Sequence, residues 1–410
     1  MRSMSEQASV AYNPFEPGFA EDPYPQYEAM REHEPVHESP FGIFLLFRYD
    51  DVLRFLRDPS LSVEDANAKP TILDKFADEV MGDERDRETG TRAMINRDPP
   101  DHTRLRKLVS KAFTPRRIEG LRPRVQELVD ASLDRAAAAG GMELMSDYAF
   151  PLPFAVISEM LGMPPTDSEK LRDWSGTLVR TLEPVVDPSL MHAILEASKN
   201  MRGLITDVIA WKRNNLSDDL LSAMLAAEEN GDVLSDEELL EQVMLLYIAG
   251  HETTVNLIGN GMLALLRNPD QLERLRSDPS LDAGAVEELL RYDSPVQMTR
   301  RITLTEVEIG GKTIPDGVFV VCGVASSNRD EAHWGPTADT VDITRPNAKE
   351  HLSFGGGAHY CLGAALARLE GQVAIGSLVR RFDTIEPTAD PEWNGRLNLR
   401  GLEKLPLAVG

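Results

Sequence analysis

Cysteine is scarce in this chain of 410 residues, which contains only Cys322 and Cys361. Two thiols are too few for a disulfide framework, an iron–sulfur cluster or a cysteine-rich zinc site, because each of these needs more sulfur atoms. A chain so poor in cysteine is expected in the cytoplasm. Cys322 lies in the apolar stretch 319–324 and is expected to be a core residue, so Cys361 is the thiol whose setting needs explanation.

Positive charge is also in deficit, since 43 Lys and Arg face 67 Asp and Glu and leave a formal net charge of −24. This balance argues against nucleic acid as a general partner. No long apolar run is free of polar residues, and even the stretch 243–266 contains His251 and Glu252. A bilayer centre tolerates such side chains poorly, so we expect a buried helix and no membrane span. The first residues lead into no apolar segment, so no signal peptide is expected.

Linkers rich in Pro, Gly or Ser, internal repeats and low-complexity runs are absent as well. A chain without such boundaries is predicted to be one large domain, 1–410, although its length alone would allow more. Its hydrophobic content of 42% is typical of a globular protein.

The most informative stretch is Phe354–Gly363, here called the Cys loop, in which three consecutive glycines precede Cys361. Glycines allow a bend that other residues cannot follow. The Ala- and Leu-rich run 362–370 is predicted to be helical, so Cys361 lies near a helix N-terminus, where backbone N–H groups and the helix dipole favour a thiolate. A thiolate of this kind could bind a haem iron, and small residues would let a flat macrocycle approach. A buried Cys beside a flexible loop is the alternative, and the loop alone does not decide between them.

A second unusual stretch lies within the longest predicted helix. Ser235 and Glu238 form a capping-box pattern, and the helix is predicted to continue to about Arg267, a length of about 45 Å. Its middle, 249–254, has the sequence Ala-Gly-His-Glu-Thr-Thr, which helix propensity disfavours. Such local conflicts often mark function, and Gly250 could leave a notch for a small ligand. A solvated polar patch is the alternative. The His-Glu pair does not complete a zinc-protease pattern, because Val255 stands where the second His would be.

The remaining pattern predicts a mainly α protein with a smaller β region, an α+β fold. His102 and Arg106 lie four residues apart and share a face of a predicted helix, and Glu288 and Arg291 can pair within another. The polar stretch 62–96 is predicted to be a long loop, either functional or simply solvated, and 178–186 is compatible with a movable lid or a helix end. The other predicted elements are helices at 25–33, 51–57, 102–109 and 285–292, several helices within 123–225, strands at 41–49 and within 299–323, and a hairpin at 393–406.

Four features occur in one order along the chain: 249–254, the pair Glu288 and Arg291, Asn328-Arg329-Asp330, and the Cys loop. Together they resemble the cytochrome P-450 superfamily, the haem-thiolate monooxygenases, and in particular its soluble bacterial branch. The resemblance also includes 98–106 and 342–345, and so extends from about residue 15 to the end of the chain. It implies the cytochrome P-450 fold, with the haem between the long central helix and the helix after the Cys loop.

The resemblance also implies roles for individual residues around a haem b (iron protoporphyrin IX). Cys361 would be the metal ligand, and Thr253 would hold dioxygen by a hydrogen bond while Glu252 relays protons. His102 and Arg106 would bind one haem propionate, and Arg301 and His359 the other. Further haem contacts would come from Ala249, Gly250, Phe354 and Gly363. The substrate pocket would be lined by Leu245, Ala249, Val296, Met298, Thr299 and Leu399. Glu288, Arg291 and Arg345 would form a structural network.

The departures from the family pattern are small. His359 stands where many members have Arg, Glu252 replaces the more common Asp, and Val341 stands where Phe is usual. The longer Glu252 side chain would lengthen the proton relay by one methylene.

The implied activity is insertion of one atom of O2 into a hydrophobic small molecule, by hydroxylation or epoxidation. The length leaves no room for a fused electron-transfer domain, so the family pattern implies a separate ferredoxin and an NAD(P)H-dependent ferredoxin reductase. Arg104, Lys107 and Lys111 are candidates for the docking face. A peroxide-driven peroxygenase and a non-catalytic haem sensor are the alternatives, and the pair Glu252-Thr253 argues against both.

Overall fold

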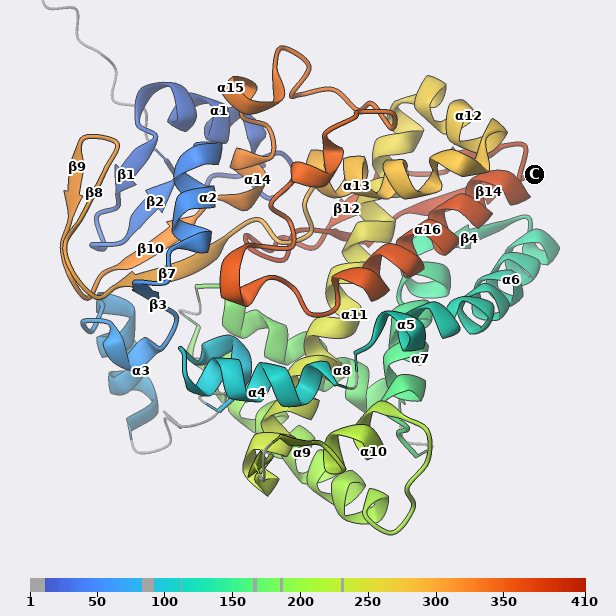
Figure 1. Ribbon diagram of the computed structural model, residues 1–410. Coiled ribbons are helices and arrows are strands. Elements are labelled where there is room, and N and C mark those ends of the chain that lie inside the picture. The colour runs from blue at the N-terminus through green and yellow to red at the C-terminus, as the bar shows by residue number, and fades with distance from the viewer. Residues whose placement is uncertain (1–11, 83–91, 112, 165–167, 185–186, 230–231) are drawn as a thin grey trace, which may run out of the picture.

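The computed structural model describes residues 12–82, 92–111, 113–164, 168–184, 187–229 and 232–410 (Figure 1). Helices dominate, and the predicted fold class, mainly α with a smaller β region, is confirmed. The α-helices are α1 (Tyr24–His33), α2 (Tyr49–Arg57), α3 (Ile72–Met81), α4 (Asp101–Ser110), α5 (Pro115–Gly120), α6 (Arg122–Ala139), α7 (Pro151–Met160), α8 (Ser168–Leu178), α9 (Pro188–Lys212), α10 (Leu220–Leu225), α11 (Asp236–Arg267), α12 (Pro269–Ser277), α13 (Asp282–Tyr292), α14 (Val324–Ser327), α15 (Glu331–Trp334) and α16 (Ala364–Arg381).

The main sheet has the strand order β1-β2-β10-β7-β3. Strands β2 and β10 run parallel, and the other neighbours are antiparallel. Cys322 lies on β10 and is fully buried, which confirms it as a core residue. The strands are β1 (Val36–Glu38), β2 (Phe44–Leu46), β3 (Leu61–Ser62), β4 (Gly141–Glu143), β5 (Glu228–Glu229), β6 (Asp232–Val233), β7 (Thr299–Thr303), β8 (Val307–Ile309), β9 (Lys312–Ile314), β10 (Phe319–Cys322), β11 (Ile385–Pro387), β12 (Glu392–Trp393), β13 (Leu402–Lys404) and β14 (Pro406–Val409).

Helix α11 runs through the middle of the molecule (Figure 1). Its predicted capping box is present, because the Ser235 hydroxyl accepts a hydrogen bond from the Glu238 backbone N–H and the Glu238 carboxylate accepts one from the Ser235 N–H. The first half of α11 packs in an apolar cluster with α9 and α10, and the second half packs in another with α13 and α16. The polar stretch 249–254 lies between these two clusters, so its side chains interrupt no continuous apolar core.

The structure differs from the prediction in the stretch 62–96 and describes only part of the stretch 178–186. The stretch 62–96 is not a loop throughout, because residues 72–81 form α3, which begins with a capping box between Thr71 and Asp74. Residues 83–91 lie outside the described residues. In 178–186, residues Val179–Leu182 form a 3-10 helix, η5, after α8, and residues 185–186 again lie outside the described part. The predicted C-terminal hairpin is confirmed as β12 paired with β13.

The predicted pair on α13 is confirmed as part of a buried network. Arg291 donates two hydrogen bonds to Glu288, at 2.7 and 2.8 Å, and both side chains are fully buried. Arg345 donates to both oxygens of the same carboxylate at 3.1 Å. Arg291 also donates to the backbone oxygens of Asn328 and Ala338. The network therefore attaches the long connection after β10 to α13.

Among the described residues, the structure contains no helix with the length and apolar character needed to cross a bilayer.

Candidate active site

The Cys loop is closed by backbone contacts that only glycine permits. The Cys361 N–H donates to the Phe354 backbone oxygen at 2.9 Å. Gly355 and Gly357 have φ of 71° and 64°, in the left-handed region. A Cβ at Gly357 would lie 2.6 Å from the backbone oxygen of Leu56, because the loop packs closely on the end of α2. The run of glycines therefore fixes the position of Cys361 relative to α2 and α16.

The Cys361 thiol is accessible to solvent although protein atoms surround it on most sides. As predicted, backbone N–H groups at the start of α16, those of Gly363 and Ala364, donate toward its sulfur. These donors lower the pKa of the thiol, as predicted, but burial outweighs them and raises the pKa of Cys361 above its ordinary value. A metal ion bound to the sulfur would reverse this balance, since a coordinating thiol is deprotonated.

Four basic side chains converge beside the Cys loop. The rings of His102 and His359 have their centroids 4.2 Å apart. Burial, together with the nearby His102, Arg301 and Arg106, lowers the pKa of His359 to about 3. Arg106 donates to the Tyr360 backbone oxygen at 2.6 Å, and Arg301 donates to the backbone oxygens of Arg300 and Leu56. The division into two separate propionate-binding pairs is not visible, because His102 and His359 belong to one cluster.

These four side chains have no carboxylate partner among the described residues. Arg301 is 5% exposed, and the Nδ1 atom of the buried His102 has no hydrogen-bond partner. Arg301 is buried and Arg106 is partly buried. Enclosing their charges without an ion-pair partner is costly, and an anionic ligand would relieve that cost. The residues present thus fit a haem whose propionates meet this cluster and whose iron meets Cys361.

In the middle of α11, Ala249 is exposed although most of its neighbours on the helix are buried. The Thr253 hydroxyl donates to the Ala249 backbone oxygen at 3.0 Å. The expected notch at Gly250 is not found, because a Cβ there would lie 3.1 Å from the Ile157 side chain of α7. Gly250 therefore serves the packing of α7 on α11. Glu252 accepts a hydrogen bond from Arg396 at 3.2 Å, so it faces the hairpin of β12 and β13.

The predicted substrate-pocket residues form two groups. Val296 and Leu399 are paired in an isolated β-bridge, and the Met298 N–H donates to the Asn398 side-chain oxygen at 3.1 Å, with Thr299 following at the start of β7. Leu245 and Ala249 lie four residues apart and share one face of α11. The sequence alone does not indicate the bridge between Val296 and Leu399, because its partners are far apart in the chain.

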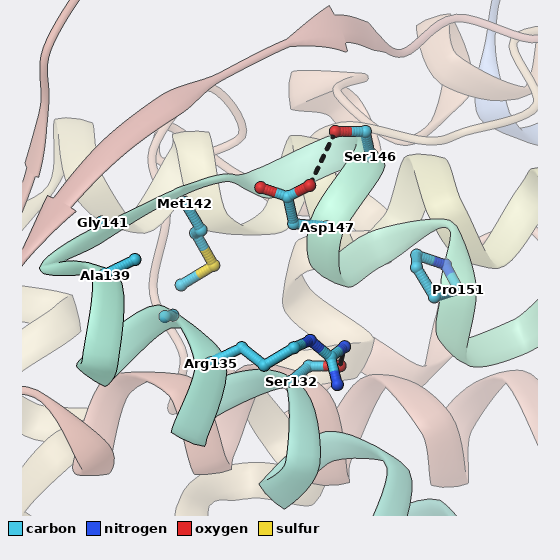
Figure 2. A pocket seen from close by; sticks show the side chains of 9 residues that line it. Ser132, Arg135, Ala139, Gly141, Met142, Ser146, Asp147 and Pro151 are labelled. Atoms are coloured by element: carbon cyan, nitrogen blue, oxygen red, sulfur yellow. Dashed lines mark hydrogen bonds between the residues drawn. The ribbon is translucent and has the colours of Figure 1, made fainter.

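A surface cavity of about 400 Å³ between α6 and α7 contains none of the predicted site residues (Figure 2). It is lined by Ser132, Arg135, Ala136, Ala139, Gly141, Met142, Ser146, Asp147 and Pro151. Arg135 donates to Ser132 at 2.9 Å, and the Ser146 hydroxyl donates to Asp147 at 3.1 Å. Its polar side chains are thus engaged with one another, and the cavity is distinct from the Cys361 site.

The sequence did not predict the ion pairs that support the Cys loop from α13 and α16. Arg368 stacks on the Phe354 ring, 4.5 Å from its centroid, and donates to Glu287 at 2.5 Å. His351 contacts the same carboxylate at 3.1 Å. Burial opposes ionisation of Glu287, but these hydrogen bonds outweigh it and lower its pKa to about 2. Phe354, placed by prediction against the haem, is therefore held in position by a buried ionic group.

Comparisons with known proteins agree with this geometry. The family model described as Cytochrome P450 matches residues 24–397. Cytochrome P450 107B1 of Saccharopolyspora erythraea is 45% identical over 404 residues, which cover 97% of this chain and 97% of the relative. Vitamin D(3) 25-hydroxylase of Pseudonocardia autotrophica is 44% identical, with 96% and 95% covered. The solved structure of the myxobacterial cytochrome P450 CYP267B1 in complex with myristic acid has a TM-score of 0.87 at 38% identity, with 97% and 98% covered.

The chain belongs to the cytochrome P450 family. It is therefore an oxidoreductase, a haem-dependent monooxygenase whose cofactor is iron protoporphyrin IX. The long central helix and the Cys-loop helix are α11 and α16, which pack against each other.

Proposed function

We propose that this monooxygenase inserts one atom of O2 into a hydrophobic small molecule and that the Cys361 sulfur would hold the haem iron. The haem, when bound through a thiolate, supplies the chemistry that cleaves O–O bonds. The chain supplies a sulfur held by the N–H groups of Gly363 and Ala364. The His102, Arg106, Arg301 and His359 cluster would bind the propionates, since its two arginines lie beside the Cys loop and donate only to backbone oxygens among the described residues.

Thr253 and Glu252 are proposed to handle protons at the middle of α11, where Ala249 and Gly250 would contact the haem. The Thr253 hydroxyl can donate outward when it leaves the Ala249 backbone oxygen, to which it is bonded at 3.0 Å. Glu252 is one residue away, and its side chain is 14% exposed. A partly exposed carboxylate beside a hydroxyl that is itself accessible can move protons between solvent and the site.

A hydrophobic substrate is supported by the predicted pocket residues and by the relatives. Leu245, Val296, Met298 and Leu399 have apolar side chains, and Thr299 adds a polar one. One relative is named for vitamin D(3), and one structural neighbour was solved in complex with myristic acid. Both are largely apolar molecules. The pocket is proposed to accept a ligand of that character, through hydroxylation or epoxidation.

Electrons are proposed to come from a separate ferredoxin and its NAD(P)H-dependent reductase, with the enzyme acting as a single domain in the cytoplasm, where nicotinamide cofactors are supplied. Of the three cations considered for docking, Arg104 forms ion pairs with Glu238 and Asp232 and is directed toward the start of α11. Lys107 and Lys111 remain candidates, because Arg106 of the same helix contacts the Cys loop.

The peroxide-driven and sensor alternatives are disfavoured by the same pair of residues. A peroxygenase receives its oxygen already reduced and has no need of a proton relay, and a sensor needs no such relay either. Glu252 and Thr253 are placed one after the other on α11, with Glu252 fixed by Arg396, as proton delivery requires.

The observation that supports the proposal most strongly is the accessible Cys361 sulfur beside the buried cationic cluster. The test is the absorption spectrum of the ferrous carbonyl complex, with Cys361→Ser compared against Cys322→Ser. The wild type and the Cys322 variant should show the red-shifted band of thiolate ligation, and Cys361→Ser should lose it. Retention of that band by Cys361→Ser would contradict the assignment. NADPH-dependent turnover with a surrogate ferredoxin then separates the monooxygenase from the two alternatives.

A further inference from the structure

Glu252 is paired with a cation from a part of the chain that is distant in sequence. The Arg396 guanidinium donates to its carboxylate at 3.2 Å. The side chains are 15% and 14% exposed, so the pair reaches solvent but is largely enclosed. Arg396 lies in the connection between β12 and β13. The resemblance to the family assigns this arginine no role in the proton relay.

The segment that carries Arg396 is itself fixed by a second carboxylate. The Glu183 side chain, directly after η5, accepts hydrogen bonds from the backbone N–H groups of Leu397 at 2.8 Å, Asn398 at 3.0 Å and Leu399 at 3.2 Å. Successive N–H groups that converge on one anion form a strong and geometrically specific binding site. The Arg396 backbone N–H also donates to the Asn394 side-chain oxygen at 3.0 Å. The backbone on both sides of the arginine is therefore held in place.

The alternative cation near Glu252 is not a substitute for Arg396. His251 Nε2 lies 3.8 Å from the Glu252 carboxylate. The ring is fully buried, its Nδ1 contacts the Tyr247 backbone oxygen at 2.8 Å, and burial lowers the pKa of His251. A neutral imidazole provides no charge to hold the carboxylate. On its other side, Glu252 faces Gly176 of α8, where a Cβ would lie 4.0 Å from its oxygen.

We propose that Arg396 is a positioning residue for Glu252 and that Glu183 anchors the segment that presents it. This inference rests on the proposed function and deepens it, because it concerns how the relay acid is oriented. A glutamate has three side-chain torsions, and a charge-assisted hydrogen bond restricts them. Arg396 keeps the carboxylate at the boundary between solvent and the middle of α11. The same segment carries Leu399 at the substrate side, so Glu183 also links pocket shape to the position of the acid.

The test uses a reaction that needs no identified substrate. With NADPH, ferredoxin and its reductase, the holoenzyme reduces O2 with two electrons and two protons to hydrogen peroxide, or with four electrons and four protons to two waters. Poor proton delivery favours peroxide. Arg396→Gln should therefore raise the ratio of hydrogen peroxide formed to NADPH oxidised severalfold, and Arg396→Lys should restore most of the wild-type ratio. Glu183→Gln should raise the ratio by a smaller factor.

Arg381→Gln is the matched control, because it removes an arginine from an exposed ion pair with Asp134. Each variant is first checked for the ferrous carbonyl band of the wild type. If Arg396→Gln does not fold, the double variant Glu252→Gln/Arg396→Gln, which leaves no unpaired charge, is compared with Glu252→Gln alone, and equal ratios are expected. An Arg396→Gln ratio equal to those of wild type and Arg381→Gln would overturn the inference. Failure of the proposed function is recognised separately, because the wild type would then lack the thiolate band or oxidise no NADPH.

Discussion

At the scale of single residues, Thr253 is the hydroxyl on which the proposed proton handling depends. Its hydroxyl is bonded to the Ala249 backbone oxygen one turn earlier on α11, so removing it should disturb the helix little. Thr253→Ala should keep NADPH oxidation but lower product per NADPH severalfold, because protons are then poorly directed. Thr253→Ser keeps the hydroxyl and is the control. The measurement is product and hydrogen peroxide per NADPH, and an unchanged yield for Thr253→Ala would exclude the relay role.

Glu370 is a buried carboxyl on α16 whose two oxygens have no hydrogen-bond partner. Burial raises its pKa to about 8, opposed only weakly by Thr254. The side chain is therefore neutral in the folded protein at neutral pH. In the unfolded chain the carboxyl loses this proton near pH 4.5, its ordinary pKa. Because the folded state binds the proton more tightly, stability declines as pH rises through this window.

Glu370→Gln should remove that decline. Below pH 4.5 the stabilisation from the neutral carboxyl is present in full. Between pH 4.5 and about pH 8, the free energy of unfolding of the wild type should fall by up to about 1.4 kcal/mol per pH unit relative to that of the variant. The measurement is the thermal midpoint of both holoproteins across this range, read from the haem absorption band. A difference between the two proteins that does not grow with pH would show that Glu370 ionises as an exposed carboxyl does.

At the scale of elements, the network of Glu288, Arg291 and Arg345 joins α13 to the connection that follows β10. Removing one partner of a buried ion pair leaves an uncompensated charge and costs about 3–5 kcal/mol. Glu288→Gln or Arg291→Gln should therefore lower the thermal midpoint strongly and reduce the yield of haem-loaded protein. Arg381→Gln, in an exposed pair with Asp134, should have little effect, since such pairs contribute about 0–1 kcal/mol. Equal effects in the buried and exposed pairs would show that the network does not stabilise the fold.

The sequence predicted those elements whose signals are local. The capping box of Ser235, the pair Glu288 and Arg291 on one helix face, and the glycines before Cys361 each depend on neighbours a few residues away. Helix α3 was missed although Ile72, Phe76 and Val80 recur at helical spacing, because the polar and charged residues on either side of it dominate the stretch 62–96. The contact of Arg396 with Glu252 was missed for a different reason, since it joins residues 144 apart through a tertiary fold.

The position of Cys361 could be predicted, but its electrostatic setting could not. The N–H donors follow from local sequence, whereas burial depends on α2, α4 and α16 meeting around the Cys loop. The cluster of His102, Arg106, Arg301 and His359 could likewise be predicted only in part. His102 and Arg106 could be paired by helical spacing, but their meeting with His359 and Arg301 depends on how the sheet packs against the helices.

At the scale of the whole molecule, acidic residues outnumber basic ones, so any positively charged docking surface must be confined to a small part of the protein. The net charge is −24, so an acidic ferredoxin is repelled at long range and must find a local cationic surface close to the haem. Helix α4 lies beside the Cys loop (Figure 1), and Arg106 bonds to Tyr360. Lys107 and Lys111 belong to this helix and its end, and both residues are exposed.

Charge reversal at these two lysines should slow reduction of the enzyme by ferredoxin and flatten its dependence on ionic strength. The physical reason is that local attraction, screened within about 10 Å at 0.1 M salt, is replaced by repulsion. Stopped-flow reduction of Lys107→Glu/Lys111→Glu is compared with Lys199→Glu/Lys404→Glu, which changes the net charge equally on α9 and β13. A slower rate in the first variant alone supports docking beside α4. Equal slowing in both would assign the effect to net charge, and unchanged kinetics in the first would place the docking surface elsewhere.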